Sequence, residues 1–133
     1  MTLYVASSAM AKRYLAEHDT TTAVALIESD PVLVTSRITE IEVRRTLTRV
    51  LDGEDLLSRR EAFAIDLDGF ALMPVDAFLC NRAASIAEQT LCKSLDAVHI
   101  ASAQRADANS TFLTFDVKQA AAAREVGLHV LGA

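Results

Sequence analysis

Three carboxylates lie at the starts of predicted helices or directly after a predicted strand, and they come from distant parts of the chain. Glu42 lies in the first turn of a predicted helix over 38–51, Asp96 in the first turn of one over 94–106, and Asp116 directly after a predicted strand. Mg²⁺ and Mn²⁺ take oxygen ligands, and Mg²⁺ is usually held by one or two carboxylates with water and phosphate oxygens. Such an ion keeps the acids charged, activates a water and stabilises charge on a phosphodiester. The three acids therefore indicate metal-assisted hydrolysis of phosphodiesters.

Each of these acids also has an ordinary structural explanation. The helix macrodipole favours acidic side chains in a first turn, and an Asp after a strand is common turn chemistry. Glu40 points to a different side of its helix from Glu42, and Asp76 can simply begin the next helix. His99 follows Asp96 by three residues, so it can face the same cleft, although a buried structural histidine is the commoner outcome.

A basic edge lies beside Glu42 and offers candidate contacts to a substrate. Arg44 and Arg45 are its closest members, with Arg37 just upstream and Arg49 one turn further on. These cations could meet RNA phosphates or the acids of a partner protein, and a solvated helix face is the simpler alternative.

The spacing of the apolar residues predicts alternating strands and helices. Strands are expected over 2–5, 32–35, 70–75, 111–115 and 128–131. Helices are expected over 8–17, 20–29, 38–51, 58–68, 76–91, 94–106 and 117–126. The expected helix ends are marked by Ser7 or Ser8, Asp30-Pro31, Gly53, Ser94 and Gly127. This pattern predicts an α/β fold with a mostly parallel central sheet and helices on both faces, and the acids are expected at the carboxyl ends of its strands.

The composition restricts the class of protein. The chain has 133 residues, 51% of them hydrophobic and 23% charged, which predicts one globular domain over 1–133 and excludes a disordered chain. No apolar run approaches the roughly 18–20 residues that span a bilayer, and the N-terminus lacks the pattern of a secretory signal. Cys80 and Cys92 form neither a disulfide framework nor a zinc pattern. We expect both to be small core residues of a reduced, cytoplasmic protein.

The formal net charge of −5 and the 5% of aromatic residues argue against strong general affinity for single-stranded nucleic acid. Any contact with a nucleic acid therefore requires a bound cation or a local basic patch that reverses the sign of the field.

Four segments match one family pattern in order: LYVASSAMAKRYLAE, VTSRITEIEVRRTL, SLDAVHIASA and FLTFDVKQAAAAREVGLHVL. The chain resembles the PIN-domain ribonucleases, and among them the VapC toxins of bacterial toxin–antitoxin pairs. The resemblance covers nearly the whole chain and matches Glu42, Asp96 and Asp116 to acidic positions of the family.

One position departs from this pattern. The family has an aspartate directly after the first strand, and this chain has Ala6 there. By resemblance that residue is a metal ligand, so we expect the chain to fold but to hydrolyse RNA at least about 100-fold more slowly than an aspartate form. Two explanations stay open, an alanine introduced to disarm a toxic nuclease and a naturally degenerate member. The kept pattern around position 6 favours the first.

The resemblance implies a three-layer PIN-like fold and the toxin of a type II toxin–antitoxin system, acting as an Mg²⁺-dependent endoribonuclease. Glu42, Asp96 and Asp116 would be catalytic, and Asp96, Asp116 and position 6 would bind Mg²⁺, for which Mn²⁺ could substitute. The implied partners are an RNA substrate, a VapB-type antitoxin that brings an arginine to the acids, and a second copy in a homodimer. No membrane partner is expected.

Two alternatives compete with this interpretation. A non-catalytic RNA- or protein-binding module on the same fold is favoured by Ala6. A receiver-like phosphoacceptor domain is disfavoured, because Ala6-Ser7-Ser8 rather than a pair of acids follows the first strand.

Overall fold

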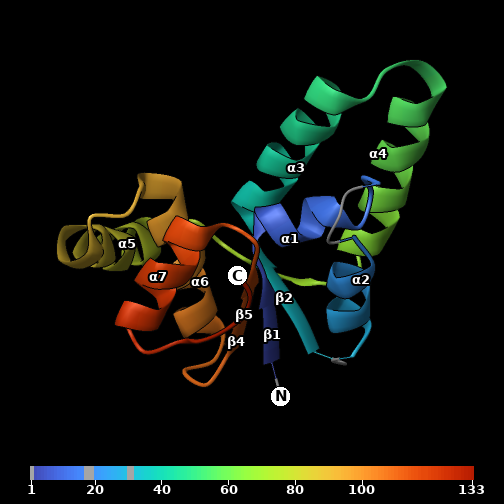
Figure 1. The fold of residues 1–133 in the computed structure, drawn as a ribbon. Coiled ribbons are helices and arrows are strands. Elements are labelled where there is room, and N and C mark those ends of the chain that lie inside the picture. The colour runs from blue at the N-terminus through green and yellow to red at the C-terminus, as the bar shows by residue number, and fades with distance from the viewer. Residues whose placement is uncertain (1, 17–19, 30–31) are drawn as a thin grey trace.

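A five-stranded parallel sheet forms the centre of the protein (Figure 1). The structure is a computed structural model that describes residues 2–16, 20–29 and 32–133. The strands are β1 (Thr2–Val5), β2 (Val32–Ser36), β3 (Ala71–Met73), β4 (Thr111–Thr114) and β5 (His129–Gly132). Their order is β3-β2-β1-β4-β5, and every pair of neighbours is parallel. The sheet confirms the predicted α/β fold.

Helices cover both faces of this sheet (Figure 1). The helices are α1 (Ser7–Lys12), α2 (Thr20–Glu28), α3 (Arg37–Val50), α4 (Gly53–Leu67), α5 (Ala77–Thr90), α6 (Ser94–Ala106) and α7 (Val117–Glu125). Helices α5, α6 and α7 lie on one side of the sheet and α1 to α4 on the other, with α3 and α4 extending beyond the carboxyl ends of the strands. Within the described residues, no helix is both long and apolar enough to cross a bilayer.

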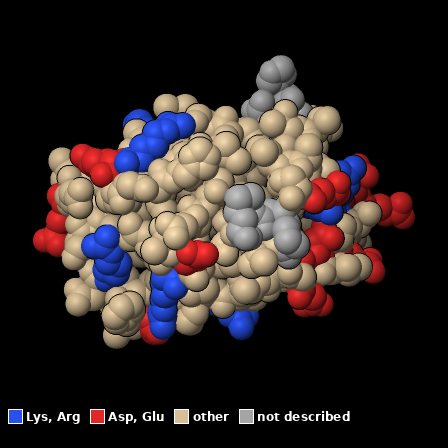
Figure 2. Space-filling view, turned by 90° about the horizontal axis from the view of Figure 1, so that it is seen from below, with Lys and Arg blue, Asp and Glu red and all other residues tan. Residues whose placement is uncertain are grey.

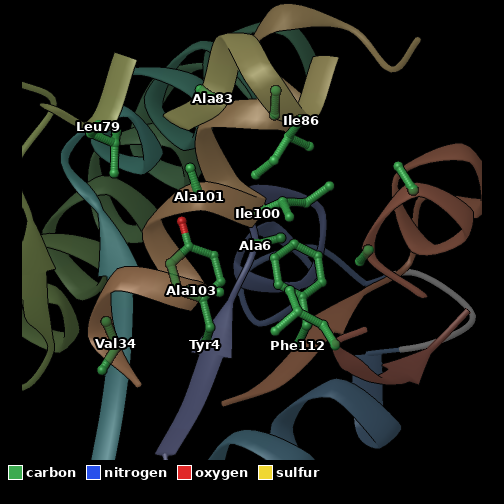
Figure 3. Packing of buried hydrophobic residues seen from close by; sticks show 14 residues of the cluster. Tyr4, Ala6, Val34, Leu79, Ala83, Ile86, Ile100, Ala101, Ala103 and Phe112 are labelled. Atoms are coloured by element: carbon green, nitrogen blue, oxygen red, sulfur yellow. The ribbon is translucent and has the colours of Figure 1, made fainter. Parts of the chain in front are cut away.

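Two apolar cores lie on the two sides of the central strand β1. Tyr4 points into the core beneath α5, α6 and α7, where its ring stacks on Phe112 with 5.3 Å between the ring centroids (Figure 3). The next residue, Val5, points into the other core with Leu47 and Phe63. A strand buried on both faces has few polar residues, which is why the sequence of β1 reads as one apolar run.

The predicted element boundaries hold within a few residues, with three exceptions. The first helix ends at Lys12 rather than at 17, and β3 is shorter than the predicted 70–75. Gly53 begins α4 instead of ending α3, because the extended Asp52 already serves as the N-cap of the new helix. The predicted helix end at Asp30-Pro31 lies outside the described residues.

The predicted serine caps are wrong. Ala6 is the N-cap of α1 and Lys93 that of α6, and neither cap makes a side-chain hydrogen bond. The Ser7 and Ser8 hydroxyls bond instead to side chains of other elements, so they are not available for capping.

The prediction that both cysteines are small core residues is also wrong for one of them. Cys80 is exposed on α5, whereas Cys92 is partly buried against the core beneath α5, α6 and α7. Both are free thiols.

Leu91, directly after α5, offers a test of backbone strain. Its φ is +61°, a left-handed conformation that favours glycine, and its side chain is 86% exposed. We expect Leu91→Gly to raise the free energy of unfolding by about 0.5–1 kcal/mol, because the relieved strain exceeds the entropy that glycine adds to the unfolded chain. Urea denaturation measures this change, with Leu91→Ala as the control that keeps the Cβ and should change little. A glycine variant no more stable than the alanine variant would contradict the prediction.

Candidate functional site

The three predicted acids line one cleft at the carboxyl ends of the strands. Glu42 reaches it from α3, Asp96 from α6 and Asp116 from the start of α7, and the cleft has a volume of about 490 Å³. The parallel sheet explains the positions of Glu42 and Asp116, because the turns after β2 and β4 lie at the same edge. Asp96 follows helix α5 rather than a strand, so its position depends on how α6 packs against the sheet. The three acids therefore lie together at one edge of the sheet, as predicted.

Local structure holds two of these acids in place. Asp116 is the N-cap of α7 and accepts a hydrogen bond from the Gln119 backbone N–H at 3.0 Å. Glu42 lies in the second turn of α3 rather than in the first, since that helix already begins at Arg37. The helix macrodipole acts mainly on the first turn, so it explains Glu40 better than Glu42.

A buried histidine fixes the Glu42 carboxylate. His99 Nε2 lies 2.6 Å from Glu42 Oε1, and the Ser7 hydroxyl donates to the same oxygen at 2.7 Å. On the other side of the ring, His99 Nδ1 lies 2.7 Å from the hydroxyl of Tyr4, which is fully buried and points toward α6 (Figure 3). His99 itself is only 2% exposed. A chain of contacts therefore runs from the core of the sheet to the cleft carboxylate.

The pKa values of Glu42 and Asp96 shift in opposite directions. Burial raises the pKa of Glu42, but the hydrogen bond and attraction of His99, with the hydrogen bond of Ser7, outweigh it and leave that pKa below its ordinary value. Burial raises the pKa of Asp96, and the negative charges of Asp116 and Glu42 raise it further than His99 and Lys93 lower it. The Asp96 end of the cleft thus has an excess of negative charge, which a cation would relieve.

Asp96→Asn is therefore expected to stabilise the protein at pH 7 in EDTA, by about 0.5 kcal/mol for partly screened like charges. The folded state binds the Asp96 proton more tightly than the unfolded state does, so the ionised carboxylate is a penalty above its raised folded pKa. The advantage of asparagine should disappear as the pH falls below the ordinary value near 4. Urea denaturation between about pH 4 and pH 7 measures both effects.

Asp55→Asn is the matched control, since Asp55 occupies the same third position of α4 that Asp96 occupies in α6. It should lose a little stability at pH 7, because only its favourable interaction with the helix dipole is removed. Equal effects of the two substitutions would contradict the repulsion inferred at Asp96.

His99 lines this cleft as well, whereas Arg44, Glu40, Arg45 and Asp76 are not among its lining residues. Arg44 lines a separate groove between α3 and α4, together with Glu40, and Arg45 is exposed on α3. Asp76 is the N-cap of α5, where it accepts from the Leu79 N–H and pairs with Arg105 at 2.8 Å. Asp76 therefore begins helix α5, which is the structural explanation that the sequence offered for it.

Sequence reasoning missed several residues that lie at the site. Ser7 and Lys12 line the cleft, and Lys93 and Lys118 lie beside the acids on its other side. For Lys93 and Lys118 the available signal was proximity in sequence, because each of these two lysines lies within three residues of Asp96 or Asp116.

Ala6 lies at the start of α1, next to Ser7, and is fully buried. It packs in the core with Tyr4 and Ile100 (Figure 3). Within the described part of the chain, no three His, Cys, Asp or Glu side chains converge closely enough to hold a metal ion by themselves. Position 6 contributes a methyl group and no oxygen to this edge of the sheet.

Comparison with solved structures identifies the fold. FitAB bound to an IR36 DNA fragment has a TM-score of 0.77 at 20% identity, over 98% of this chain and 94% of that chain. FitAcB from Neisseria gonorrhoeae has a TM-score of 0.74 at 20% identity, over 98% and 96%. VapC20 from Mycobacterium tuberculosis, a sarcin–ricin loop cleaving toxin, has a TM-score of 0.70 at 22% identity, over 90% and 94%.

Comparison with the curated proteins finds no match. The PIN domain family matches residues 4–125, which include Glu42, Asp96, Asp116, the second half of β1 and the strands β2, β3 and β4. The chain belongs to the PIN domain family.

Proposed function

We propose that this chain is a single PIN domain over residues 1–133, built as an Mg²⁺-dependent endoribonuclease. The observation that carries the proposal is the cleft, which Glu42, Asp96 and Asp116 line together at the carboxyl edge of a parallel sheet. Carboxylates gathered in this way suit metal-assisted hydrolysis of a phosphodiester. The membership of the PIN domain family supports the same reaction class.

Asp96 and Asp116 are the residues that would hold the metal. Burial and neighbouring acids raise the pKa of Asp96, and both carboxylates line the cleft. These two fit the open arrangement in which Mg²⁺ takes one or two carboxylates and completes its shell with water and phosphate oxygens. A bound Mg²⁺ would supply a more acidic water and offset charge on the phosphodiester.

Glu42 has a different role in this proposal. Its Oε1 is engaged by His99 and Ser7, which hold the carboxylate in one orientation and favour its ionised form. An ionised and oriented carboxylate is suited to accept a proton from an attacking water. We assign this role of general base to Glu42.

Ala6 would impair the reaction in this chain. The buried methyl group stands where the family pattern has an aspartate, so one oxygen ligand of the metal would be missing. An ion held by Asp96 and Asp116 alone would be less firmly placed relative to the water and the phosphate.

We further propose that the protein is the toxin of a type II toxin–antitoxin system, with a VapB-type antitoxin as its partner. Its structural neighbours include a toxin–antitoxin complex from Klebsiella pneumoniae and VapBC2 from Rickettsia felis, the latter bound to a DNA fragment from its promoter. Exposed apolar side chains on the projecting helices α3 and α4 offer a surface for such a partner. They are Ile41, Val50, Leu57 and Ile65, each more than 60% exposed.

A non-catalytic RNA- or protein-binding module on the PIN fold is the second candidate. Ala6 favours it, as does the lack of a three-residue metal group within the described part of the chain. RNA digestion by the chain and by its Ala6→Asp variant, with Mg²⁺ and with EDTA, separates the two functions. If the variant cleaves RNA with Mg²⁺ but not with EDTA, the nuclease function is supported. If the RNA stays intact in every reaction, the binding module is the remaining candidate.

A further inference from the structure

A second hollow adjoins the cleft and shares two of its acids. Its volume is about 610 Å³, and Asp96 and Asp116 line it just as they line the cleft. Helix α7 and the turn between α5 and α6 form its walls, with Leu91 and Ala122 among its apolar residues and Glu125, at the end of α7, as a third acid. The two acids therefore stand on the boundary between two neighbouring hollows.

The lysines of the chain are distributed unevenly around these hollows. The 13 basic residues comprise three lysines and ten arginines. Lys12 lines the cleft, and Lys93 and Lys118 line the second hollow. Among the described residues that line either hollow there is no arginine. Figure 2 views the opposite end of the molecule, where Lys and Arg side chains are interspersed with Asp and Glu.

Lys93 and Lys118 are exposed, and within the described part of the chain the structure gives their ammonium groups no hydrogen bond or ion pair. The positive charge of Lys93 lowers the pKa of Asp96, but of the influences on that pKa it is the smallest. Two ammonium groups that make no hydrogen bond or ion pair with the described residues are available to bind a phosphate. They also offset part of the repulsion that Asp96, Asp116 and Glu125 exert on a polyanion.

We propose that this second hollow is a subsite for the RNA backbone, in which Lys93 and Lys118 bind the phosphate next to the one that lies at Asp96 and Asp116. The inference rests on the proposed function, since it takes RNA as the substrate. A strand that passes from one hollow into the other places a phosphodiester at the two acids. The apolar lining beside the lysines leaves room for a base or ribose without selecting a sequence.

This assignment differs from the one that the sequence suggested. Arg44 lines the groove between α3 and α4 and is not among the residues that line either hollow at the acids. Lys93 and Lys118 lie on opposite segments of one hollow, one before α6 and one in α7. The chain therefore carries a local basic pair at the site although its net charge is −5.

RNA binding by this chain, measured by fluorescence anisotropy, tests the subsite. The probe is a labelled mixed-sequence RNA decamer in Mg²⁺ at several salt concentrations, and the Ala6 form should leave it uncut. Each phosphate contact to a single strand contributes about 0.7 to the slope of log K against log salt. For the double variant Lys93→Ala/Lys118→Ala we expect a slope smaller by about 1.4 and binding weaker by about 10- to 25-fold at about 0.1 M salt.

Arg60→Ala/Arg82→Ala is the control that removes the same charge away from both hollows. It should bind within about 2-fold of the parent, and Lys93→Arg/Lys118→Arg should retain most of the affinity. A parent that binds RNA equally well with and without the two lysines overturns the subsite. So does a parent that binds no RNA.

Cleavage by the Ala6→Asp form distinguishes a failure of the proposed subsite from a failure of the proposed nuclease function. If that form cuts RNA and the added Lys93→Ala/Lys118→Ala pair changes neither KM nor its salt dependence, the subsite is wrong and the nuclease stands. If that form cuts no RNA in any condition, the proposed function fails.

Discussion

Ala6→Asp is expected to raise the rate of Mg²⁺-dependent RNA cleavage by at least about 100-fold, which corresponds to about 2.7 kcal/mol at 1.36 kcal/mol per tenfold. The new carboxylate would lie at the start of α1, beside Ser7, which lines the cleft. A further oxygen ligand would place the metal and the attacking water more firmly. The measurement is the initial rate of fragment formation from total RNA, with purified parent and variant side by side.

Ala6→Asn is the matched control for size and shape, because it adds a similar side chain without the charge. It should gain much less activity than Ala6→Asp, and EDTA should abolish cleavage by both. Adding Asp96→Asn or Asp116→Asn to the Ala6→Asp form should remove the gained activity, because both acids are proposed ligands. A parent as fast as its aspartate form would falsify the assigned role of position 6.

The same variant has a cost in stability that provides a second readout. Position 6 is fully buried in an apolar cluster, so an ionised aspartate there adds a buried charge. Ala6→Asp should therefore melt at a lower temperature than the parent in EDTA. Mg²⁺ should restore more of the melting temperature in the variant than in the parent, since a ligand that binds only the folded state stabilises it.

His99→Ala is expected to lower the free energy of unfolding by about 2–4 kcal/mol. The ring is 2% exposed and contacts Tyr4, Ser7 and Glu42, so its removal leaves a cavity and a buried Tyr4 hydroxyl that loses a partner. Removing His99 also removes the main influence that lowers the pKa of Glu42, so the pKa of Glu42 should rise. Urea denaturation measures the stability, and NMR titration of the Glu42 carboxyl measures its pKa.

Tyr4→Phe is the control that removes one hydroxyl and keeps the stacked ring. It should cost only about 1 kcal/mol, and its effect should not add fully to that of His99→Ala, because both remove the same contact. If the His99→Ala protein were as stable as the parent, the contacts of His99 with Tyr4 and Glu42 would contribute nothing to the fold.

Residue periodicity alone predicted the architecture. Apolar runs such as Thr2–Val5 read as buried strands, and the helices between them imposed parallel pairing, since parallel strands need such connections. The edge that would carry the site followed from the same pattern, because helices begin at the carboxyl ends of parallel strands. Glu42, Asp96 and Asp116 were therefore placed together from strand and helix order, without knowledge of any side-chain contact.

Tertiary packing decided what these acids contact. His99 and Glu42 are 57 residues apart in sequence, and their contact depends on how α3 and α6 pack against the sheet. The same packing places Arg44 in the groove between α3 and α4, and Lys93 and Lys118 beside the acids. Apart from the closeness of Lys93 and Lys118 to acids in the sequence, no local pattern distinguishes these basic residues, because each one is typical of a solvated cation on a helix surface or in a turn.

The sequence by itself determined the fold class, the order of the elements along the chain and the edge at which the acids gather, because residue periodicity and the succession of strands and helices are read directly from the sequence. Only the tertiary structure decided that His99 is buried between Tyr4 and Glu42, that Asp96 carries excess negative charge, and that two free lysines flank the site. Those properties arise from burial and from distances between side chains of different elements, and both depend on how the elements pack.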